Sequence, residues 1–391
     1  MGVRFIEELP ITGRRTFIRV DLDVPVKDGQ VVDDARVRAA LPTIRHAVAR
    51  GARVILASHL GRPRGKVHEG LRLEPVGARL AELLELDIIA ADDCVGDGVR
   101  KLAQDLRDGQ VLLLENLRFR REEEENEPAF AERLASLAEV YVHDAFACAH
   151  RPSASGVGML RHVKQRGVGY QMRKELRFLG EALSRPSRPF VAVVGGARLS
   201  ERLGLLQSLL GRADAVLVGG GLAFTCLRAR GLGVGASPVE PDRERAAADL
   251  LEAARQRKVE LLLPEDHLVA SGPEDAAGEA LAGAIPDGRV GLDIGPRTLA
   301  RYGEALRAAR TVFWCGPMGV FERPAFAAGT LGIARAVAGA PGVSVVSGRQ
   351  ASAALVQAGV ADEVSHVSTG GGASLELVEG RALPGVVALE S

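Results

Sequence analysis

A glycine pair followed by two arginines near the middle of the chain could bind phosphate. Residues 191–203 read VAVVGGARLSERL, in which an apolar run of strand length meets Gly195 and Gly196 and a helix-like segment follows. Glycines permit a sharp turn and let a ligand approach free backbone N–H groups. Arg198 and Arg202 stand four residues apart, so they share a helix face beside the positive end of its dipole. This pattern fits a phosphate site, and a plain strand-to-helix corner with two solvated arginines fits it equally well.

In the first half of the chain, polar residues follow the ends of the expected strands. They comprise two carboxylates, four arginines and a histidine: Asp21, Asp23, Arg36, His59, Arg62, Arg118 and Arg151. The carboxyl ends of parallel strands meet at one edge of a sheet, so these side chains would converge on one crevice. Guanidinium groups bind phosphate and carboxylate with two donors at once, and the set predicts an anion site. The alternative is a scatter of surface arginines without a common ligand.

The second half of the chain has glycine-rich loops instead of basic ones. Residues 218–225 (VGGGLAFT) and 367–374 (VSTGGGAS) join the central glycine pair as possible phosphate cradles. The sequence lacks GxxxxGK[ST], which argues against a P-loop NTPase, and lacks GxGxxG after its first strand, which argues against a dinucleotide dehydrogenase. Three such loops and an arginine-rich half suggest two phosphate-bearing ligands brought together across a hinge.

The composition is that of a two-domain α/β protein with no global charge. The chain has 391 residues, and its 50 Lys and Arg balance its 50 Asp and Glu, which argues against nucleic-acid or membrane-surface binding. The four cysteines are scattered without a CxxC pair, so neither a disulfide framework nor a zinc site is expected. No apolar run reaches about 18 residues. We therefore expect a soluble, cytoplasmic protein, with a monomer as the default state.

Short apolar runs alternate with segments of helical period, which predicts doubly wound parallel sheets. Strands are expected at residues 16–20, 53–57, 87–90, 111–114, 140–142, 191–194, 215–218, 260–263, 311–314, 343–346 and 366–368. Helices are expected at 37–50, 74–84, 98–106 and 128–138, with Asp33 and Asp97 as possible caps. A long helix at 169–183 and a proline-rich stretch at 184–189 indicate a domain boundary between two similar halves.

These motifs together resemble the phosphoglycerate kinase family along nearly the whole chain. The matching stretches are RVDLDVP (19–25), SHLGRP (58–63), LLLENLRF (112–119), DAFACAHR (144–151), VVGGARLSER (193–202), VGGGLAFT (218–225), GLDIGP (291–296), WCGPMGVFE (314–322) and SHVSTGGGASLEL (365–377). The resemblance implies two Rossmann-like domains. A 3-phosphoglycerate-binding domain would span 1–170, a hinge helix and linker 171–188, and a nucleotide-binding domain 189–375, with the tail 376–391 packing back on the first domain.

The resemblance also implies a role for each matching position. The first-half set named above would hold 3-phosphoglycerate, and the catalytic residues would be Arg36, Arg198, Gly371 and Gly372. The nucleotide pocket would contain Arg202, Gly219, Gly220, Gly221, Gly291, Leu292, Gly316, Met318, Glu322, Gly348, Arg349, Gln350 and Ala351. The reaction would be reversible phosphoryl transfer between Mg-ATP and 3-phosphoglycerate, giving 1,3-bisphosphoglycerate and ADP. Hinge closure would position the two ligands and exclude water.

Departures from the family pattern lie mainly on the nucleotide side. Arg198 and Arg202 stand where the family has lysines, and Cys315 stands where it has asparagine. Gln350 replaces the aspartate that binds the metal of Mg-ATP, and it offers only a neutral carbonyl, so no protein metal ligand is expected. Ala351 lacks the family's hydroxyl.

The first half departs less. Asp23 and His143 each replace an asparagine, and a histidine is lost after Arg151. We expect a phosphoglycerate kinase. The alternative is a related protein that binds 3-phosphoglycerate but is catalytically impaired and acts as a binding or regulatory protein. A third hypothesis is a phosphoryl-transfer enzyme with another donor or metal requirement.

Overall fold

The structure, a computed structural model, describes residues 2–390 and divides them into two compact units. Unit 1 comprises the described residues through Leu176 together with those from Ala382 onward, and unit 2 comprises Arg177–Arg381. None of the helices in this part of the chain is both long enough and apolar enough to cross a membrane.

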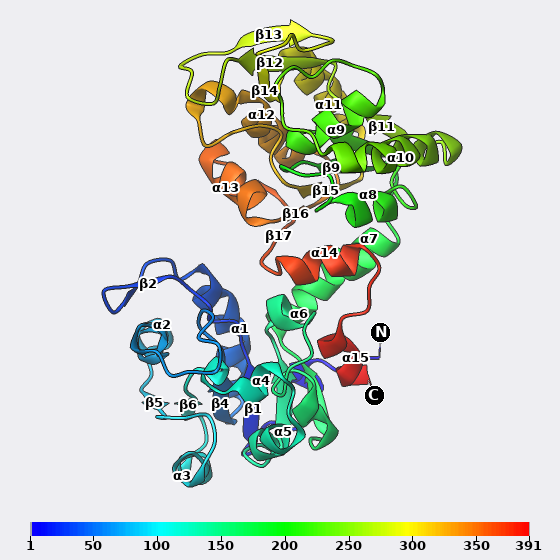
Figure 1. The fold of residues 1–391 in the computed structure, drawn as a ribbon. Helices are drawn as coiled ribbons and strands as arrows, with labels where there is room; N and C mark the ends of the chain where they lie inside the picture. Colours follow the sequence, from blue (N-terminus) through cyan, green and yellow to red (C-terminus); the bar gives the residue numbers. More distant parts are fainter. Residues whose placement is uncertain (1, 391) are drawn as a thin grey trace. The chain divides into compact units, whose positions relative to one another are not determined.

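Unit 1 is built on a parallel sheet of six strands in the order β5-β6-β4-β1-β7-β8 (Figure 1). The strands are β1 (Arg15–Arg19), β4 (Arg53–Ala57), β5 (Ile88–Ala90), β6 (Val111–Leu113), β7 (Val140–His143) and β8 (Gln165–Val168). A short antiparallel hairpin joins β2 (Val26–Lys27) and β3 (Gln30–Val31). The central strands are buried, as expected for a sheet covered by helices on both faces.

The helices of unit 1 pack their apolar stripes on this sheet. They are α1 (Ala35–Ala49), α2 (Glu74–Leu84), α3 (Asp97–Asp105), α4 (Arg121–Glu124), α5 (Pro128–Ala135), α6 (Tyr170–Glu175) and α15 (Pro384–Glu390), with 3₁₀ turns at Ile6–Glu8, Glu69–Leu71, Leu117–Phe119, Phe146–Cys148 and Gly158–Arg161. Val37 and Ile44 of α1 and Leu80 of α2 share one core with Val54 and Leu56 of β4. Val37 and Ile44 stand seven residues apart in α1, which places them on one face of that helix.

Unit 2 repeats the architecture with a parallel sheet in the order β11-β10-β9-β15-β16-β17. Its strands are β9 (Phe190–Val194), β10 (Ala215–Val218), β11 (Glu260–Leu262), β15 (Thr311–Cys315), β16 (Val343–Ser347) and β17 (His366–Ser368). A separate antiparallel sheet, β13-β12-β14, contains β12 (Asp266–Ala270), β13 (Glu279–Ala282) and β14 (Val290–Ile294).

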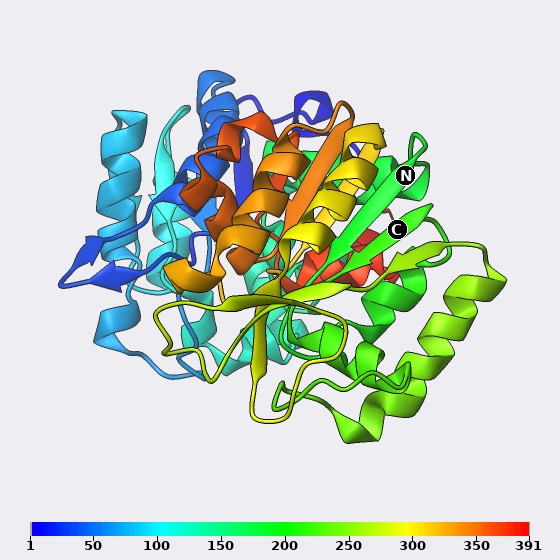
Figure 2. The same ribbon diagram turned by 90° about the horizontal axis from the view of Figure 1, so that it is seen from above.

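Helices cover the parallel sheet of unit 2 on both sides (Figure 2). They are α7 (Ala182–Ser184), α8 (Leu203–Leu209), α9 (Gly221–Ala229), α10 (Glu244–Gln256), α11 (Pro296–Ala308), α12 (Ala328–Ala338), α13 (Arg349–Ala358) and α14 (Gly372–Val378), with 3₁₀ turns at Pro241–Arg243, Pro324–Phe326 and Ala361–Glu363. Tyr302 of α11, Ile333 of α12 and Leu355 of α13 share a core with Val191 and Trp314 of the sheet. These three helices therefore lie on one face, and α8, α9 and α10 lie on the other (Figure 2).

The predicted class, two doubly wound parallel sheets, is confirmed. Both cap predictions are wrong. Gly96 is the N-cap of α3, with Asp97 as its first helical residue, and Asp34 is the N-cap of α1. Asp33 instead accepts a hydrogen bond at 2.9 Å from the backbone N–H of Ala35.

The expected long helix at 169–183 consists of three pieces. It begins as α6, continues as a π-helical segment over Leu176–Glu181, and ends as α7. A π-helical segment has one more residue per turn than an α-helix, so it changes the face that later side chains occupy. The division between the two units falls at Leu176 and Arg177, inside this segment. Its role as a hinge stays a prediction, as do the domain boundaries expected from the family.

Candidate active site

In unit 1, the carboxyl ends of β1, β4, β6 and β7 carry most of the expected anion-binding residues. Asp21 and Asp23 follow β1, His59 follows β4, and Arg118 follows β6. Arg151 follows β7, and Arg36 lies in the first turn of α1. This placement is the one that the sequence predicted for a ligand edge.

Two carboxylates hold Arg36. Its Nη1 atom donates to both carboxylate oxygens of Asp21, at 3.2 and 3.0 Å, and lies 3.9 Å from Asp23 Oδ2. Asp23 also accepts a hydrogen bond from the backbone N–H of Gly61 at 2.8 Å. Burial raises the pKa of Asp21, and the charge of Arg36 opposes that shift. The pair fixes one guanidinium group at the sheet edge and partly neutralises it.

Arg118 is held by the neighbouring loop. Its Nη1 atom donates to the carbonyl of Gly61 at 2.9 Å, and its Nε atom lies 3.4 Å from a carboxylate oxygen of Glu124. The side chain is only 13% exposed, so its remaining N–H groups are constrained in direction. Arginine positioned in this way is suited to a planar or tetrahedral anion.

The basic residues of unit 1 gather around His59. Its ring is buried, and Nε2 lies 3.6 Å from Asp23 Oδ2. Burial, followed by the positive charges of Arg19, Arg118, Arg36 and Arg151, holds the pKa of His59 well below its usual range. Three of these arginines were predicted, whereas Arg19 was not. We call Arg36, Arg118, Arg151 and His59 the basic cluster.

Two of the predicted arginines are less constrained. Arg151 is exposed, and its Nε atom donates to Nε2 of His150 at 3.2 Å. Arg62 is exposed and forms no hydrogen bond or ion pair with another residue in the described part of the chain. Exposed guanidinium groups of this kind remain available to a ligand.

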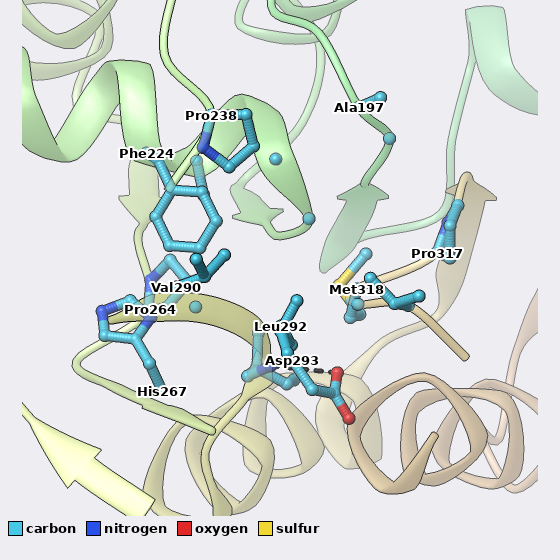
Figure 3. A pocket seen from close by; sticks show the side chains of 18 of the residues that line it. Ala197, Phe224, Pro238, Pro264, His267, Val290, Leu292, Asp293, Pro317 and Met318 are labelled. Atoms are coloured by element: carbon cyan, nitrogen blue, oxygen red, sulfur yellow. Dashed lines mark hydrogen bonds between the residues drawn. The ribbon is translucent and has the colours of Figure 1, made fainter. Parts of the chain in front are cut away.

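Unit 2 contains a cavity of about 330 Å³ with mostly apolar walls. Figure 3 shows Phe224 and Pro238 on one side of it and Leu292 and Met318 on another. The buried ring of His267, on β12, also lines the cavity and packs at a 45° angle to Phe224, with the ring centroids 5.7 Å apart. A cavity of this size with apolar walls suits a heteroaromatic base.

Glycines allow the loops around this cavity to touch. A Cβ atom on Gly291 would lie 2.5 Å from Phe224 Cζ, and one on Gly219 would lie 2.5 Å from Met318 Sδ. Gly220 has φ +72°, and a Cβ there would lie 2.7 Å from the carbonyl oxygen of Gly196. The glycine motifs therefore have a packing role that does not depend on a ligand.

The cavity wall includes only part of the predicted nucleotide set. Gly220, Gly221, Gly291, Leu292, Met318, Glu322 and Gln350 line it, together with Arg198 from the predicted catalytic set. Arg202, Gly219, Gly316, Gly348, Arg349 and Ala351 are not among the lining residues. Arg202 remains close, because a Cβ on Gly196 would lie 3.6 Å from its Nε atom, which is buried and has no hydrogen-bond partner in the described residues.

The sequence did not single out several residues of the cavity wall, namely Phe224, Pro238, Pro264, His267 and Val290. Phe224 lies in the glycine motif at 218–225, and that motif is the only sequence feature that could have indicated it. The others come from separate segments with no chemical pattern.

The loop at 367–374 is held by two serines. The hydroxyls of Ser368 and Ser374 form a hydrogen bond of 2.7 Å, and Ser368 Oγ accepts from the backbone N–H of Gly370 at 3.2 Å. Gly371 has φ +54° and directly precedes α14, whose first residue is Gly372. Both glycines are exposed, and they follow the end of β17.

The described residues contain no group of three or more His, Cys, Asp or Glu that could hold a metal ion. At the family's metal position, Gln350 donates from Nε2 to Glu322 Oε1 at 3.1 Å. The protein oxygens offered there are the Glu322 carboxylate and the Gln350 carbonyl. These two are a sparse set for Mg²⁺, which fits an ion held mainly by nucleotide phosphates.

Comparison with known proteins identifies the family. The profile of the family described as phosphoglycerate kinase matches residues 6–381. The chain is 56% identical over 395 residues to the phosphoglycerate kinase of Anaeromyxobacter sp. (strain K), with 100% of both sequences covered. It is 50% identical over 386 residues to that of Moorella thermoacetica, with 98% of both covered.

Solved structures agree with the sequence relatives. Phosphoglycerate kinase from Coxiella burnetii superposes with a TM-score of 0.92 at 38% identity, with 99% of both chains covered. The enzyme from Pyrococcus horikoshii OT3 gives a TM-score of 0.81 at 33% identity, with 98% of both covered. Nothing in these comparisons supports the alternative of an impaired binding protein. The sequence motifs, the two sheets and the relatives agree, and the chain belongs to the phosphoglycerate kinase family.

Proposed function

We propose that the chain catalyses reversible transfer of the terminal phosphoryl group of ATP to the carboxylate of 3-phosphoglycerate, giving 1,3-bisphosphoglycerate and ADP. The observation that carries this proposal is the basic cluster of unit 1. There, at the carboxyl edge of a parallel sheet, the charges of three guanidinium groups lower the pKa of one buried histidine, His59. A small dianionic phosphate with a neighbouring carboxylate is the chemistry that such a cluster recognises.

On the substrate side, the two better-held arginines would set the position of the anion. Arg36, fixed by Asp21, and Arg118, fixed by the Gly61 carbonyl, present donors whose directions are limited before binding. The exposed Arg62 and Arg151 would close on the phosphate as it binds. Preorganised donors reduce the entropy lost on binding. Asp23, which has His59 and Gly61 as neighbours, would accept from the substrate hydroxyl.

On the nucleotide side, the base would occupy the apolar cavity beside Phe224. The backbone amide of Gly221, the first residue of α9, and the guanidinium group of Arg198 would face the phosphates. Glu322, held by Gln350, would accept from hydroxyl groups of the ribose. This arrangement keeps the base in an apolar environment and the charged groups among donors.

The chemical step needs charge stabilisation more than covalent help. Phosphoryl transfer proceeds in line, with charge spread over the equatorial oxygens of the moving group. Arg36, Arg198 and the N–H groups of Gly371 and Gly372 are the donors that we assign to those oxygens. When bound with ATP, Mg²⁺ would neutralise phosphate charge, and the Gln350 carbonyl and a Glu322 oxygen would be the protein groups that hold it.

Finer properties expected from the family remain proposals. They are a monomeric state, a cytoplasmic location, and closure of the two units about residues 171–188. Light scattering in solution tests the first, and small-angle scattering with and without both substrates tests the last.

A coupled assay with ATP, Mg²⁺ and 3-phosphoglycerate tests the function. We expect turnover on the order of 10 to 10³ s⁻¹, the usual range for enzymes. Arg118→Met should raise the KM for 3-phosphoglycerate, and Phe224→Ala should raise the KM for ATP, each with little effect on the other substrate. Calorimetric binding of 3-phosphoglycerate without any turnover would reject the kinase and favour the binding protein.

A further inference from the structure

A buried arginine lies behind the basic cluster and has no role in the function described so far. Arg19, the last residue of β1, is only 3% exposed. Its Nε atom donates to Ser155 Oγ at 3.0 Å, and its Nη1 atom donates to the carbonyl of Val20 at 2.6 Å. Its Nη2 atom lies 3.2 Å from Nδ1 of His59. The guanidinium group is therefore held on three sides, with one nitrogen facing the histidine.

A buried glutamate completes this arrangement. Glu123 is 2% exposed and accepts from the hydroxyl of Ser155 at 2.6 Å and from its backbone N–H at 2.9 Å. The Ser155 hydroxyl thus accepts from Arg19 and donates to Glu123. Glu123 lies in α4 within an acidic run, residues 122–125, in which Glu124 and Glu125 are exposed. Its negative charge balances the cation of Arg19 inside unit 1.

The contact between Arg19 and His59 determines where the histidine proton lies. A guanidinium group has donors and no acceptor, and it stays charged in proteins. His59 Nδ1 must therefore accept, which requires a lone pair on that atom. The ring then carries its single proton on Nε2, the nitrogen that lies 3.6 Å from Asp23 Oδ2.

We propose that Arg19 is a positioning residue that fixes His59 as the neutral Nε2–H tautomer, with Ser155 and Glu123 holding Arg19 in place. His59 then presents a hydrogen-bond donor to the substrate at any pH at which the enzyme is folded. This inference deepens the proposed function and rests on it for the identity of the ligand.

The charges around His59 explain why a neutral donor is useful there. The groups that face or act on the ring are Arg19, Arg36, Arg118, Arg151, Asp23 and Cys148, whose Sγ atom lies 3.8 Å from Nδ1. A protonated ring would add a further cation to four others and would lose its contact with Arg19. Burial and these cations keep the pKa of His59 low, so its donor does not titrate in the physiological range.

Nitrogen-15 NMR of histidine-labelled protein tests the tautomer directly, with His59→Asn used for assignment. In the wild-type protein we expect Nδ1 of His59 to have the shift of an unprotonated nitrogen and Nε2 that of a protonated one. In Arg19→Met, Nδ1 loses its donor, so we expect a mixture of the two neutral tautomers. A wild-type protein with the proton on Nδ1, or an Arg19→Met protein with the wild-type tautomer, would overturn the proposal.

Glu123→Gln is the matched control because it disturbs the same buried network but leaves Arg19 as donor. Its His59 should keep the Nε2–H tautomer, and Arg19→Lys should restore it in part. If Arg19→Met does not fold, the wild-type spectrum and the Glu123→Gln spectrum still decide the matter. Loss of the Nε2–H tautomer in Glu123→Gln would contradict the assignment of the effect to Arg19.

Kinetics separate this role from a purely structural one. Arg19→Met should raise the KM for 3-phosphoglycerate about 10-fold, the scale of one hydrogen bond to a charged group, and should leave the KM for ATP nearly unchanged. Equal losses for both substrates, with the wild-type tautomer retained, would refute positioning. Addition of 3-phosphoglycerate should shift the Nε2 resonance of His59. An unshifted resonance with the expected tautomer would show that His59 does not donate to 3-phosphoglycerate, and it would leave the tautomer assignment intact.

Discussion

Gln350 donates its side-chain amide to the carboxylate of Glu322 at 3.1 Å, where a metal-binding carboxylate is expected from the family. Gln350→Asp would place two carboxylates side by side, and a divalent cation would relieve their repulsion. We predict that the Mg²⁺ concentration for half-maximal activity falls about 10-fold, a typical effect of one added ligand group. Titration of Mg²⁺ at fixed ATP measures this.

Gln350→Asn is the control for this substitution, since it shortens the side chain without adding charge. An equal response of the two variants would mean that charge at this position is not limiting. Position 351 is left as alanine in both variants. Ala351 is fully buried, so Ala351→Thr, which restores the family hydroxyl, would overpack the core and obscure the test.

Gly291 leaves room for Phe224 in the wall of the cavity. A Cβ atom there would lie 2.5 Å from Phe224 Cζ, so Gly291→Ala must displace the aromatic ring. We predict a rise of about 10-fold in the KM for ATP, the scale of a lost aromatic contact, with an unchanged KM for 3-phosphoglycerate. Gly272→Ala, where no atom lies within 4 Å of the new Cβ, is the control. Equal effects of the two substitutions would exclude this role for the ring.

Arg36 binds both oxygens of Asp21 through a single guanidinium nitrogen, at 3.2 and 3.0 Å, and leaves its other donors for a ligand. Arg36→Lys keeps the charge but loses the fork, so we predict a loss of about 100-fold in kcat/KM for 3-phosphoglycerate, equal to about 2.7 kcal/mol. Arg38→Lys alters an exposed residue of the same helix that pairs with Asp34, and its kinetics should match those of the wild type. Wild-type kinetics for Arg36→Lys would show that charge alone suffices at this position.

His143, buried at the end of β7, should make unit 1 sensitive to acid. Burial lowers its pKa to about 3, whereas the unfolded chain titrates near 6.5. Between these values the unfolded state binds a proton that the folded state does not, so stability is full above pH 6.5 and falls as the pH drops. The loss is about 1.4 kcal/mol per pH unit, or about 2 kcal/mol from pH 6.5 to 5.

His143→Asn, which introduces the asparagine of the family pattern, should reduce this acid dependence. Its side-chain carbonyl can accept from the backbone N–H of Ala145, as Nδ1 of His143 does at 3.3 Å. Urea unfolding at pH 5, 6, 7 and 8 gives the slope for each variant, with the exposed His162→Asn as control. The prediction fails if His143→Asn and the wild type lose stability in parallel.

Elements whose signals are local could be predicted from the sequence. The strands β4 and β17 and the helix α2 have the predicted bounds, because an apolar run or stripe ends there at turn residues or a glycine. The strand β8 was missed because its first two residues, Gln165 and Arg166, are only half buried at a sheet edge. The antiparallel strands β12 and β14 were also missed, because Asp266 and His267 in β12 and Gly291 and Asp293 in β14 interrupt their apolar runs.

The residues of the candidate site also differ in how well the sequence predicts them. The anion-binding residues follow strand ends, so the topology of a parallel sheet places them together. The wall of the base cavity depends on which distant segments meet, and nothing in the neighbourhood of His267 in the sequence indicates that Phe224 packs beside it. Glu123 lies among glutamates of which Glu124 and Glu125 are exposed, and only the packing of unit 1 distinguishes it. The pairing of a strand arginine with that glutamate is likewise set by tertiary structure.

The helix α15 belongs to unit 1 although it follows all of unit 2 along the chain. The backbone N–H of Gly385 donates to the carbonyl of Ala149 at 2.9 Å, and Val386 and Leu389 are buried. During synthesis on the ribosome, the domain that emerges first therefore lacks a piece of its own core until translation ends. A released chain that ends at residue 381 should hold a completed unit 2 and a protease-sensitive unit 1, although unit 1 is synthesised first.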